Sequence, residues 1–230
     1  ISSMLKKLNI ESKFVNGLRV SNAETIEVAE MVLAGKVNKQ IVTDIELHGV
    51  KAVGISGKDG DTVRAKKIEK DGVDYGYVGT VESVDPTLVK TLIDNDIIPV
   101  IAPIGKDATG QSYNINADYM AVAIAGSLEA EKLVFLSDIE GVYKDKDDPS
   151  SMISELHVHE AEKLISEGYV GGGMIPKLQN CIDAIEEGVN RVHILDGRIP
   201  HSLLLEIFTN KGIGTAILRE DGEKYYDEHE

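Results

Sequence analysis

The sequence has a single cysteine, Cys181, and no tryptophan among its 230 residues. No intrachain disulfide can form, and a packed thiol in a reducing compartment, the cytoplasm, is the simplest interpretation. Apolar runs stay short of the ~20 residues that a membrane-spanning helix needs. Basic residues are also scarce, because 24 lysines and arginines stand against 39 acidic residues, a formal net charge of −15. Such an acidic chain is a poor partner for nucleic acid or an anionic membrane.

Several signatures of common enzyme classes are missing too. The chain contains no G-x-G-x-x-G and no Walker lysine motif, so standard dinucleotide and P-loop sites lack support. His157 and His159 lie two residues apart without nearby cysteines or a well-spaced third ligand, and we therefore expect no protein-held metal. No serine or cysteine stands in a nucleophile-elbow context, which argues against covalent hydrolase chemistry.

Helical and apolar extended segments alternate through most of the chain. This alternation is typical of an α/β protein with an open, mostly parallel sheet sandwiched by helices. Ser21 opens a capping box and predicts a helix that Gly35 would end. The polar segment 61–84 departs from the rhythm, and its Asp71-Gly72 pair predicts a hairpin that projects from the sheet. Apolar strands are expected at 51–56, 97–105, 132–136 and 191–195.

The most informative segment is GGGMIPKLQ, residues 171–179. Pro176 suits the first position of a helix, so Lys177 would fall in the first turn of a helix that runs to about Glu187. A cation there opposes the helix macrodipole, at a cost of roughly 0.3–1 kcal/mol. The arrangement is favourable if an anion lies between the glycine loop and the lysine. The alternative is a glycine-rich loop whose lysine points into solvent.

Two earlier loops carry polar side chains suited to binding. Arg19, in the loop Asn16–Val20, is able to clamp a carboxylate bidentately, although an isolated arginine is more often a surface residue. Asn114 and Asn116 stand one residue apart at the entry to a helix of small apolar residues. Asn116 can be explained as a helix cap, with Asp118 favouring the dipole, but a cap does not account for Asn114.

The strand expected at 132–136 ends in SDIEGVY. Asp138 leaves this buried strand where open α/β sheets bind ligands, and Gly141 permits a tight turn. The position suits a contact to a ribose hydroxyl or a phosphate. Asp-x-x-Gly also describes many ordinary turns, so both interpretations stay open.

Taken together, these motifs resemble the amino acid kinase family, and the resemblance runs in order from residue 1 to about Leu218. N-I-N-A-D, S-D-I-x-G-V and the glycine–methionine–x–x–lysine segment are found in related kinases that act on aspartate, glutamate, carbamate or UMP. N-G-L-R-V points more narrowly to the branch that acts on acetylglutamate. The segments that carry the resemblance are NGLRVSNAETIEVAEMVLAGKVNK, SYNINADYMA, LVFLSDIEGVY, GGGMIPK and HSLLLEIFTNKGIGTAI.

The resemblance implies two lobes on one continuous sheet, with residues 1–127 binding the acyl amino acid and forming the dimer contact, and residues 128–230 binding ATP. The implied reaction moves the γ-phosphoryl of ATP, with Mg²⁺ bound through the nucleotide, onto the side-chain carboxylate of N-acetyl-L-glutamate. Phosphoryl transfer depends on positioning and charge neutralisation, which fits a chain without a covalent nucleophile. The product would be an acyl phosphate of arginine biosynthesis.

Roles carry over onto the matching positions of this sequence. Lys177 would stabilise the transferring phosphoryl, and Asp118 would orient the lysines as a counter-charge. Substrate-binding residues would be Arg19, Asn114 and Asn116. The nucleotide would be bound by Asp138, Ile139, Glu140, Gly141, Val142, Tyr143, Tyr169, Val170 and Gly171. The hairpin near Asp71 would cover the amino acid.

One departure from the family pattern concerns the start of the chain. Family members begin with a strand that carries a lysine and a Gly-Gly turn, followed by a second glycine-rich loop, and neither precedes Ile1 here. We therefore expect the chain as given to lack one catalytic lysine, several phosphate-binding N–H groups and a strand, which puts its activity in this form in doubt.

Three alternatives and two further expectations complete the interpretation. The fold is also compatible with a kinase for carrier-bound aminoadipate, a kinase for another amino acid, or a non-catalytic ligand-binding module. The C-terminal motif resembles that of arginine-inhibited members, so feedback inhibition by arginine is expected. A homodimer, or a higher homo-oligomer, is the family default.

Overall fold

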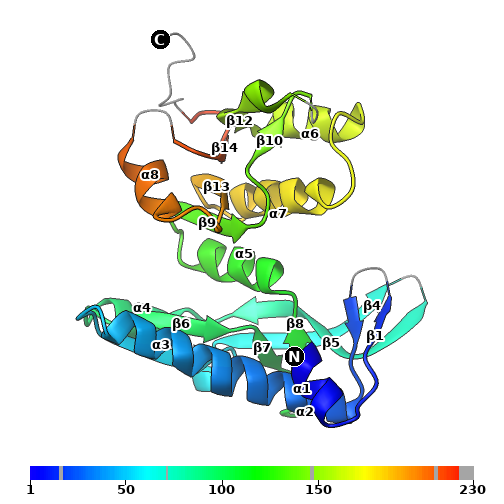
Figure 1. The fold of residues 1–230 in the computed structure, drawn as a ribbon. Coiled ribbons are helices and arrows are strands. Elements are labelled where there is room, and N and C mark those ends of the chain that lie inside the picture. Colours follow the sequence, from blue (N-terminus) through cyan, green and yellow to red (C-terminus); the bar gives the residue numbers. More distant parts are fainter. Residues whose placement is uncertain (16–17, 71, 146–147, 210–211, 223–230) are drawn as a thin grey trace. The chain divides into compact units, whose positions relative to one another are not determined.

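A computed structural model describes residues 1–15, 18–70, 72–145, 148–209 and 212–222 (Figure 1). The chain divides into two compact units, unit 1 (Ile1–Ile124) and unit 2 (Ala125–Glu230). This division falls within helix α5 (Ala117–Ser127), three residues before the boundary expected from the sequence. The functions assigned to the two lobes stay predictions. Among the described residues, no helix combines the length and apolar character needed to cross a membrane.

The helices of unit 1 include one long, nearly continuous stretch. It comprises α2 (Ala23–Glu30), the π-helical segment η1 (Met31–Val37) and α3 (Asn38–Glu46), while α1 (Ser2–Lys7) and α4 (Thr87–Ile93) stand apart from it. The predicted helix end at Gly35 is therefore wrong. A glycine inside a helix costs only about 1 kcal/mol, and Val32 continues the buried face by packing with Leu5 and Val28.

The capping residue of α2 also differs from the prediction. Asn22, rather than Ser21, accepts a hydrogen bond from the N–H of Thr25 at 2.8 Å through its Oδ1. Ser21 is instead fully buried, and its hydroxyl donates to the carbonyl of Arg19 at 3.1 Å. The prediction failed because Ser21 pairs with Gly76 as a strand residue, so Asn22, the next polar residue, caps the helix.

Strands of unit 1 form a closed four-stranded barrel beside a parallel pair. The barrel contains β4 (Val63–Lys70), β5 (Val73–Val84), β8 (Ser112–Ile115) and β7 (Ile104–Lys106), in that order. The parallel pair is β3 (Ala52–Ser56) with β6 (Ile98–Ala102), and β1 (Lys13–Val15) pairs with β2 (Leu18–Val20). The short 3₁₀ turn η2 (Asp59–Asp61) leads into β4.

The hairpin expected over residues 61–84 is present as β4 and β5. It does not simply project from a sheet, because its strands close a barrel whose buried core includes Val63, Tyr113 and Ile115. Gly72 of the predicted turn has the positive φ of 67° that such a turn requires, whereas Asp71 lies outside the described residues.

Unit 2 is built on a four-stranded sheet in the order β12 (Glu155–His157), β14 (Thr215–Leu218), β13 (Arg191–Asp196) and β9 (Lys132–Ser137). β13 runs parallel to β9 and antiparallel to β14. A small antiparallel hairpin, β10 (Val142–Tyr143) with β11 (Met152–Ile153), contains the 3₁₀ turn η3 (Pro149–Ser151). The helices are α6 (Val158–Ser166), α7 (Met174–Glu186) and α8 (Ser202–Phe208), and all contact the sheet (Figure 1).

Helix α8 has an inverted distribution of polarity. Its buried residues are Ser202 and Glu206, at 6% and 2% exposure. The Glu206 carboxylate contacts His193 Nδ1 at 2.7 Å and accepts from the N–H of Ile213 at 2.7 Å. Burial raises the pKa of Glu206, but these bonds outweigh burial and leave the pKa below its usual value. The apolar side chains of α8, in contrast, are exposed: Leu203, Leu204, Leu205, Ile207 and Phe208.

The α/β fold class is confirmed, because helices accompany parallel strand pairs in both units, β3 with β6 in unit 1 and β9 with β13 in unit 2. One continuous sheet through both lobes stays a prediction.

Candidate active site

The segments that contain Arg19 and Asn114, both singled out from the sequence, lie next to each other along one edge of strand β5. β4 occupies the other edge of this strand. Ser21, two residues after Arg19, forms a parallel bridge with Gly76. Asn114 on β8 pairs in parallel with Val78. Because Gly76 and Val78 are two residues apart in one strand, the two pairing positions are separated by roughly 7 Å. The structure therefore brings the strands of Arg19 and Asn114 together.

Gly76 makes this close approach possible. Its φ is +67°, a value that L side chains rarely adopt. A Cβ at this position would lie 2.2 Å from the carbonyl oxygen of Ser21. Two backbone hydrogen bonds fix the bridge, from the N–H of Ser21 to the carbonyl of Tyr75 at 3.1 Å and from the N–H of Tyr77 to the carbonyl of Ser21 at 2.7 Å.

The guanidinium of Arg19 is oriented by three neighbours. Its Cζ lies 4.4 Å from the centroid of the Phe14 ring, a cation–π contact. Nη2 donates to Ser2 Oγ at 2.8 Å, and Nη1 donates to Ser12 Oγ. Burial lowers the pKa of Arg19 from its ordinary value, yet an arginine stays charged at neutral pH. The first residues of the predicted loop, 16–17, lie outside the described residues.

Side chains alternate in burial along β8. Tyr113 and Ile115 are buried in the barrel core, whereas Asn114 is half-buried. Successive side chains of a strand point to opposite faces, so the Asn114 amide faces away from the core. This placement explains why a polar residue is tolerated in the strand and leaves its amide available for hydrogen bonding to a ligand.

The start of helix α5 carries the other two predicted residues of unit 1. Asn116 Oδ1 accepts from the N–H of Asp118 at 2.9 Å and from the N–H of Tyr119 at 3.4 Å. This is the helix-cap geometry that the sequence left open for Asn116. Asp118 lies in the first turn of α5, where a carboxylate is favoured by the helix dipole.

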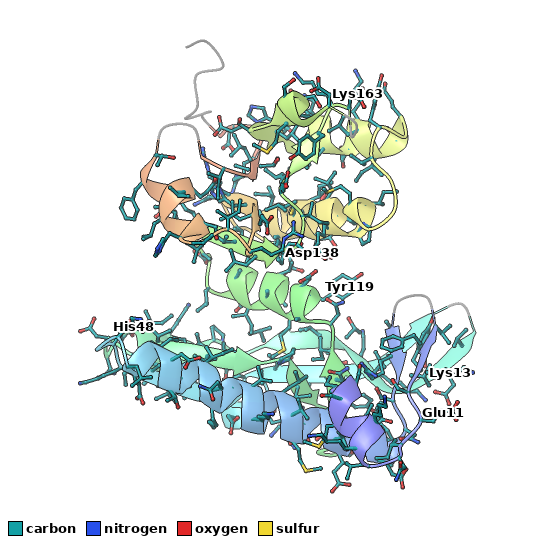
Figure 2. All side chains as sticks on the ribbon, in the orientation of Figure 1. Glu11, Lys13, His48, Tyr119, Asp138 and Lys163 are labelled. Carbon is teal, nitrogen blue, oxygen red and sulfur yellow. The ribbon has the colours of Figure 1, made fainter. Side chains whose placement is uncertain are left out.

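A cavity of about 620 Å³ lies beside the start of α5 in unit 1. It is lined by Lys66, Lys67, Ile68, Glu69, Thr80 and Tyr119. Figure 2 shows Tyr119 projecting from α5. The Lys67 ammonium contacts the Asp74 carboxylate at 2.7 Å, and this hydrogen bond raises the pKa of Lys67 and lowers that of Asp74.

In unit 2, charged residues lie at the carboxyl ends of the parallel strands β9 and β13. Asp138 follows β9 directly and is exposed (Figure 2). The neighbouring strand ends in Asp196, whose carboxylate is almost fully buried and holds Arg198 in a bidentate pair, with an Nη2–Oδ2 distance of 2.8 Å. The Arg198 hydrogen bonds lower the pKa of Asp196, and Asp196 raises that of Arg198, with a smaller contribution from the charges of Asp138 and Glu140.

Asp196 and Arg198 were not singled out from the sequence. The available signal was Asp-Gly-Arg directly after an apolar strand, a position equivalent to that of Asp138 after β9. Because parallel strands end at the same edge of a sheet, two such loops are expected to lie together. The pairing of Asp196 with Ser137, which precedes Asp138, bears this out.

The predicted nucleotide loop, residues 138–143, has a defined internal geometry. Tyr143 OH donates to Glu140 Oε2 at 2.6 Å. This hydrogen bond to a carboxylate, together with burial, raises the pKa of Tyr143 to about 12. Gly141 and Val142 are buried, and Ile139 is half-buried. The loop therefore presents Asp138 and Glu140 outward on a backbone anchored at its end.

Lys177 lies at the start of α7, but the helix begins earlier than predicted. Its first residue is Met174, so Pro176 occupies the third helical position and not the first. Proline is tolerated there because the first four N–H groups of a helix have no intrahelical acceptor. Lys177 remains in the first turn, and this turn contains no acidic residue. The adverse dipole placement inferred from the sequence is confirmed.

The first turn of α7 lies at the edge of the sheet where strands β9 and β13 end. α7 packs against β13 and leads into it through a short turn at 187–190, so helix and strand run antiparallel. With 13 and 6 residues, both are roughly 20 Å long. The amino end of α7 therefore lies level with the carboxyl end of β13, where Asp196 and Arg198 stand.

The glycine loop before α7 is open. No heavy atom lies within 4 Å of a Cβ built at Gly171, Gly172 or Gly173. Of the three, only Gly172 has a positive φ, +56°. The left-handed backbone that favours glycine therefore occurs at one of these positions, and the other two glycines leave space beside the helix start. The N–H of Met174 donates to the carbonyl of Gly171 at 3.2 Å.

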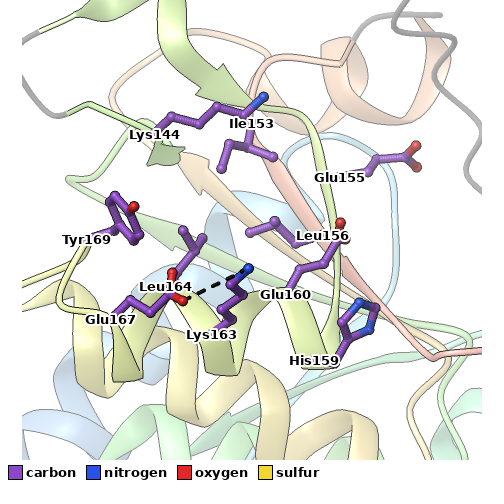
Figure 3. Close-up of a pocket in the computed structure, with 10 residues that line it drawn as sticks. All are labelled: Lys144, Ile153, Glu155, Leu156, His159, Glu160, Lys163, Leu164, Glu167 and Tyr169. Carbon is purple, nitrogen blue, oxygen red and sulfur yellow. Dashed lines mark ion pairs between the residues drawn. The ribbon is translucent and has the colours of Figure 1, made fainter.

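A second cavity, of about 510 Å³, lies in unit 2 (Figure 3). It is lined by Lys144, Ile153, Glu155, Leu156, His159, Glu160, Lys163, Leu164, Glu167 and Tyr169. Tyr169, one of the predicted nucleotide residues, is 60% exposed, and its N–H donates to the carbonyl of Leu164 at 3.1 Å. Lys163 and Glu167 form an ion pair at 3.9 Å on one wall.

The predicted residues thus form two sets in different units. Arg19, Asn114, Asn116 and Asp118 belong to unit 1, and the remainder belong to unit 2. In the parts of the chain that the structure describes, no three histidine, cysteine or acidic residues are grouped so as to hold a metal ion. Open glycines, a helix start and a cation beside the carboxyl ends of two parallel strands, β9 and β13, define a protein suited to binding phosphates.

Comparison with known proteins identifies the family. The model of the amino acid kinase family matches residues 1–196, and the chain belongs to this family. Its sequence is 52% identical over 226 residues to an acetylglutamate kinase of Moorella thermoacetica, covering 95% of this chain and 76% of that protein. The resemblance inferred from the sequence motifs is therefore confirmed.

Solved structures support the same fold. A structure of N-acetylglutamate synthase from Neisseria gonorrhoeae, complexed with coenzyme A and N-acetyl-glutamate, matches with a TM-score of 0.82 and 28% identity. The match covers 96% of this chain and 50% of that one. A second structure of that synthase, with coenzyme A and L-arginine, matches with a TM-score of 0.77 at 28% identity, over 94% of this chain and 50% of that chain.

Proposed function

We propose that this chain acts as a kinase that transfers the γ-phosphoryl of ATP to the side-chain carboxylate of N-acetyl-L-glutamate, a step of arginine biosynthesis. The observation that carries the proposal is the 52% identity to an acetylglutamate kinase across 95% of the chain. The reaction needs positioned charges and no covalent nucleophile. That requirement agrees with the cationic, amide and carboxylate side chains described above.

In unit 1, Arg19 and Asn114 bind the acyl amino acid. The substrate carries two carboxylates and an amide. The Arg19 guanidinium, preoriented by two serine hydroxyls, matches a carboxylate, and the Asn114 amide matches the acetamido group or a carboxylate. Asn116 contributes through its amide nitrogen while its oxygen caps α5.

Lys177 and Asp118 are the catalytic residues. Acceptor carboxylate and donor phosphate are both anionic, so an ammonium between them offsets their repulsion as the phosphoryl moves. Removing one such preorganised donor typically lowers the rate by ~10²–10³. Asp118 acts as a counter-charge to the lysines and not as a base, because the acceptor carboxylate is already ionised at neutral pH.

The nucleotide binds in unit 2, between residues 138–143 and 169–171. Mg²⁺ enters with the nucleotide, since this ion is usually held by phosphates and only one or two carboxylates. The exposed carboxylates of Asp138 and Glu140 are the groups of this loop able to contact it. The open space at Gly171 and Gly173 leaves room for phosphate oxygens beside the N–H groups at the start of α7.

The test is formation of a hydroxamate-trappable acyl phosphate by the complete gene product with ATP, Mg²⁺ and N-acetylglutamate. Parallel assays with glutamate, aspartate, carbamate, UMP and carrier-bound aminoadipate distinguish kinases for neighbouring substrates. Calorimetry separates the remaining alternative, a non-catalytic module, which would bind nucleotide and acyl amino acid without turnover. Turnover with N-acetylglutamate well above that with the other acceptors is the expected result.

Regulation and assembly follow the family. We expect arginine to inhibit the enzyme, supported by the C-terminal motif and by the related synthase structure that contains L-arginine. Millimolar arginine that leaves activity unchanged would refute this. A homodimer or a higher homo-oligomer is expected, with a cytoplasmic location where ATP is available. Apolar side chains exposed on α3 and β3, such as Ile41 and Val53, support self-association, which sedimentation would test.

A further inference from the structure

One buried hydroxyl joins the two strands of the hairpin that ends the nucleotide loop. Thr215, on β14, is fully buried. Its Oγ1 accepts from the N–H of Val142 at 2.8 Å and donates to the carbonyl of Ile153 at 2.7 Å. Val142 and Ile153 are paired residues of β10 and β11. The hairpin pair is therefore linked through a side chain from another sheet.

The same hydroxyl sets the position of Gly141. A Cβ at Gly141 would lie 2.8 Å from Thr215 Oγ1 and 3.1 Å from the sulfur of Met152. Real Cβ atoms essentially never lie within 3.0 Å of another heavy atom, so the contact with Thr215 Oγ1 requires glycine at this point of the loop. The next residues of the loop are then fixed by the Val142 N–H and by the bond from Tyr143 to Glu140.

Thr215 is itself held by a rigid surrounding. β14 lies between β12 and β13 in the sheet, and all four of its residues are buried. Thr215 pairs with Ile194 of β13. The N–H of Gly214 donates to Glu206 at 3.2 Å, and the N–H of Ala216 donates to the carbonyl of Ser154 at 2.8 Å. The hydroxyl therefore has a fixed position, to which the backbones of Val142 and Ile153 are hydrogen-bonded.

The hairpin needs such an anchor. Each of its strands has only two residues, and an isolated two-stranded hairpin is marginally stable in water. It supplies Lys144 and Ile153 to the wall of the 510 Å³ cavity in Figure 3. A shift of the hairpin would move both this wall and residues 138–143.

We propose that Thr215 is a positioning residue for nucleotide binding, which acts through the backbone of Gly141 and Val142 and touches no substrate. The inference rests on the proposed function, because it concerns the loop assigned to the nucleotide. A hydroxyl that both accepts and donates is required. Valine, with the same branched shape, would leave the Val142 N–H and the Ile153 carbonyl without this link.

The experiment compares Thr215→Val with Thr215→Ser, using the complete gene product. Thr215→Val should raise the KM for ATP roughly tenfold, as expected for loss of about one hydrogen bond, with the KM for N-acetylglutamate within twofold of wild type. Thr215→Ser keeps the hydroxyl and should restore the KM for ATP. Thr62→Val is the matched control, because Thr62 is also fully buried and donates to the Asp59 carbonyl at 2.6 Å, but in unit 1.

A second measurement needs no turnover. In the nucleotide-free protein, the Val142 amide proton should exchange as slowly as amides of the four-stranded sheet, and the valine variant should lose this protection while the serine variant keeps it. Fast exchange of the Val142 amide in wild type would overturn the inference, even if the valine variant failed to fold.

Unchanged KM for ATP in Thr215→Val would also overturn it, as would an equal rise in both KM values. Absence of acyl phosphate formation by wild type would contradict the proposed function instead. The exchange measurement would then still decide whether Thr215 holds the loop.

Discussion

Replacing Gly76 by alanine tests whether the shared edge of β5 positions the acyl amino acid. The change has two separable costs. The first is the φ of +67°, which penalises an L side chain by roughly 1–2 kcal/mol. The second is the contact of the new Cβ with the Ser21 carbonyl oxygen at 2.2 Å, which forces the bridge to open.

Opening the bridge removes the two backbone hydrogen bonds of Ser21, at 3.1 and 2.7 Å. Each is worth about 0.5–1.5 kcal/mol net. The total loss of unfolding free energy for Gly76→Ala is therefore roughly 2–5 kcal/mol. Gly72→Ala is the matched control, because Gly72 also has a φ of +67° but no heavy atom within 4 Å of its Cβ position. It should lose only the first cost, roughly 1–2 kcal/mol.

Urea unfolding measures the two stabilities, and steady-state kinetics measure the consequence for the site. Gly76→Ala should raise the KM for N-acetylglutamate about tenfold, equivalent to ~1.4 kcal/mol. The reason is that opening the Ser21–Gly76 bridge allows β2, and with it Arg19, to move away from Asn114. The KM for ATP should stay within twofold. Equal stability losses in the two variants, or an unchanged KM for N-acetylglutamate in Gly76→Ala, would refute the reasoning.

Three further outcomes are expected. Lys177→Ala should lower kcat by ~10²–10³ with the circular dichroism spectrum unchanged, and a rate within a few-fold of wild type would contradict its role. Asn116→Ala should destabilise the protein by about 1 kcal/mol through loss of the α5 cap, measured by urea unfolding. Because Arg198 lowers the pKa of Asp196, that pair stabilises the fold above about pH 4 and less as pH falls through the depressed pKa. Wild type should therefore exceed Arg198→Met in melting temperature at pH 7, with the difference shrinking below pH 4 and in high salt.

Local patterns predicted much of the fold. Apolar runs placed β9 and β13 within one residue of their ends. The ends of these segments are determined mainly by hydrophobic periodicity and by turn residues, and both signals come from residues that are neighbours in the sequence. Tertiary packing overrode such signals at Gly35 and Ser21, where burial of Val32 and pairing with Gly76 decided the outcome.

Candidate site residues could be found from the sequence where they stand in short motifs, but not where they depend on contacts between segments far apart in the chain. Asn114, Asp138 and Lys177 stand out because each polar or charged residue occupies a position that its local element does not favour or explain. Roles for these residues stay predictions. The hydroxyl of Thr215 carries no such signal, since its partners Val142 and Ile153 are 73 and 62 residues away in sequence. Contacts of that kind follow only from the folded topology.

Helix α8 makes hydropathy a misleading guide to mutational tolerance in this region. A leucine-rich segment would ordinarily be protected from polar substitution, yet here lysine at Leu204 or Phe208 should leave the fold of unit 2 intact, because those side chains are 55% and 77% exposed. The sensitive positions are the two polar ones. Replacing Glu206 by leucine would remove the hydrogen-bond acceptor of Ile213 and His193. A substitution that makes the helix more uniformly apolar would therefore lower the free energy of unfolding.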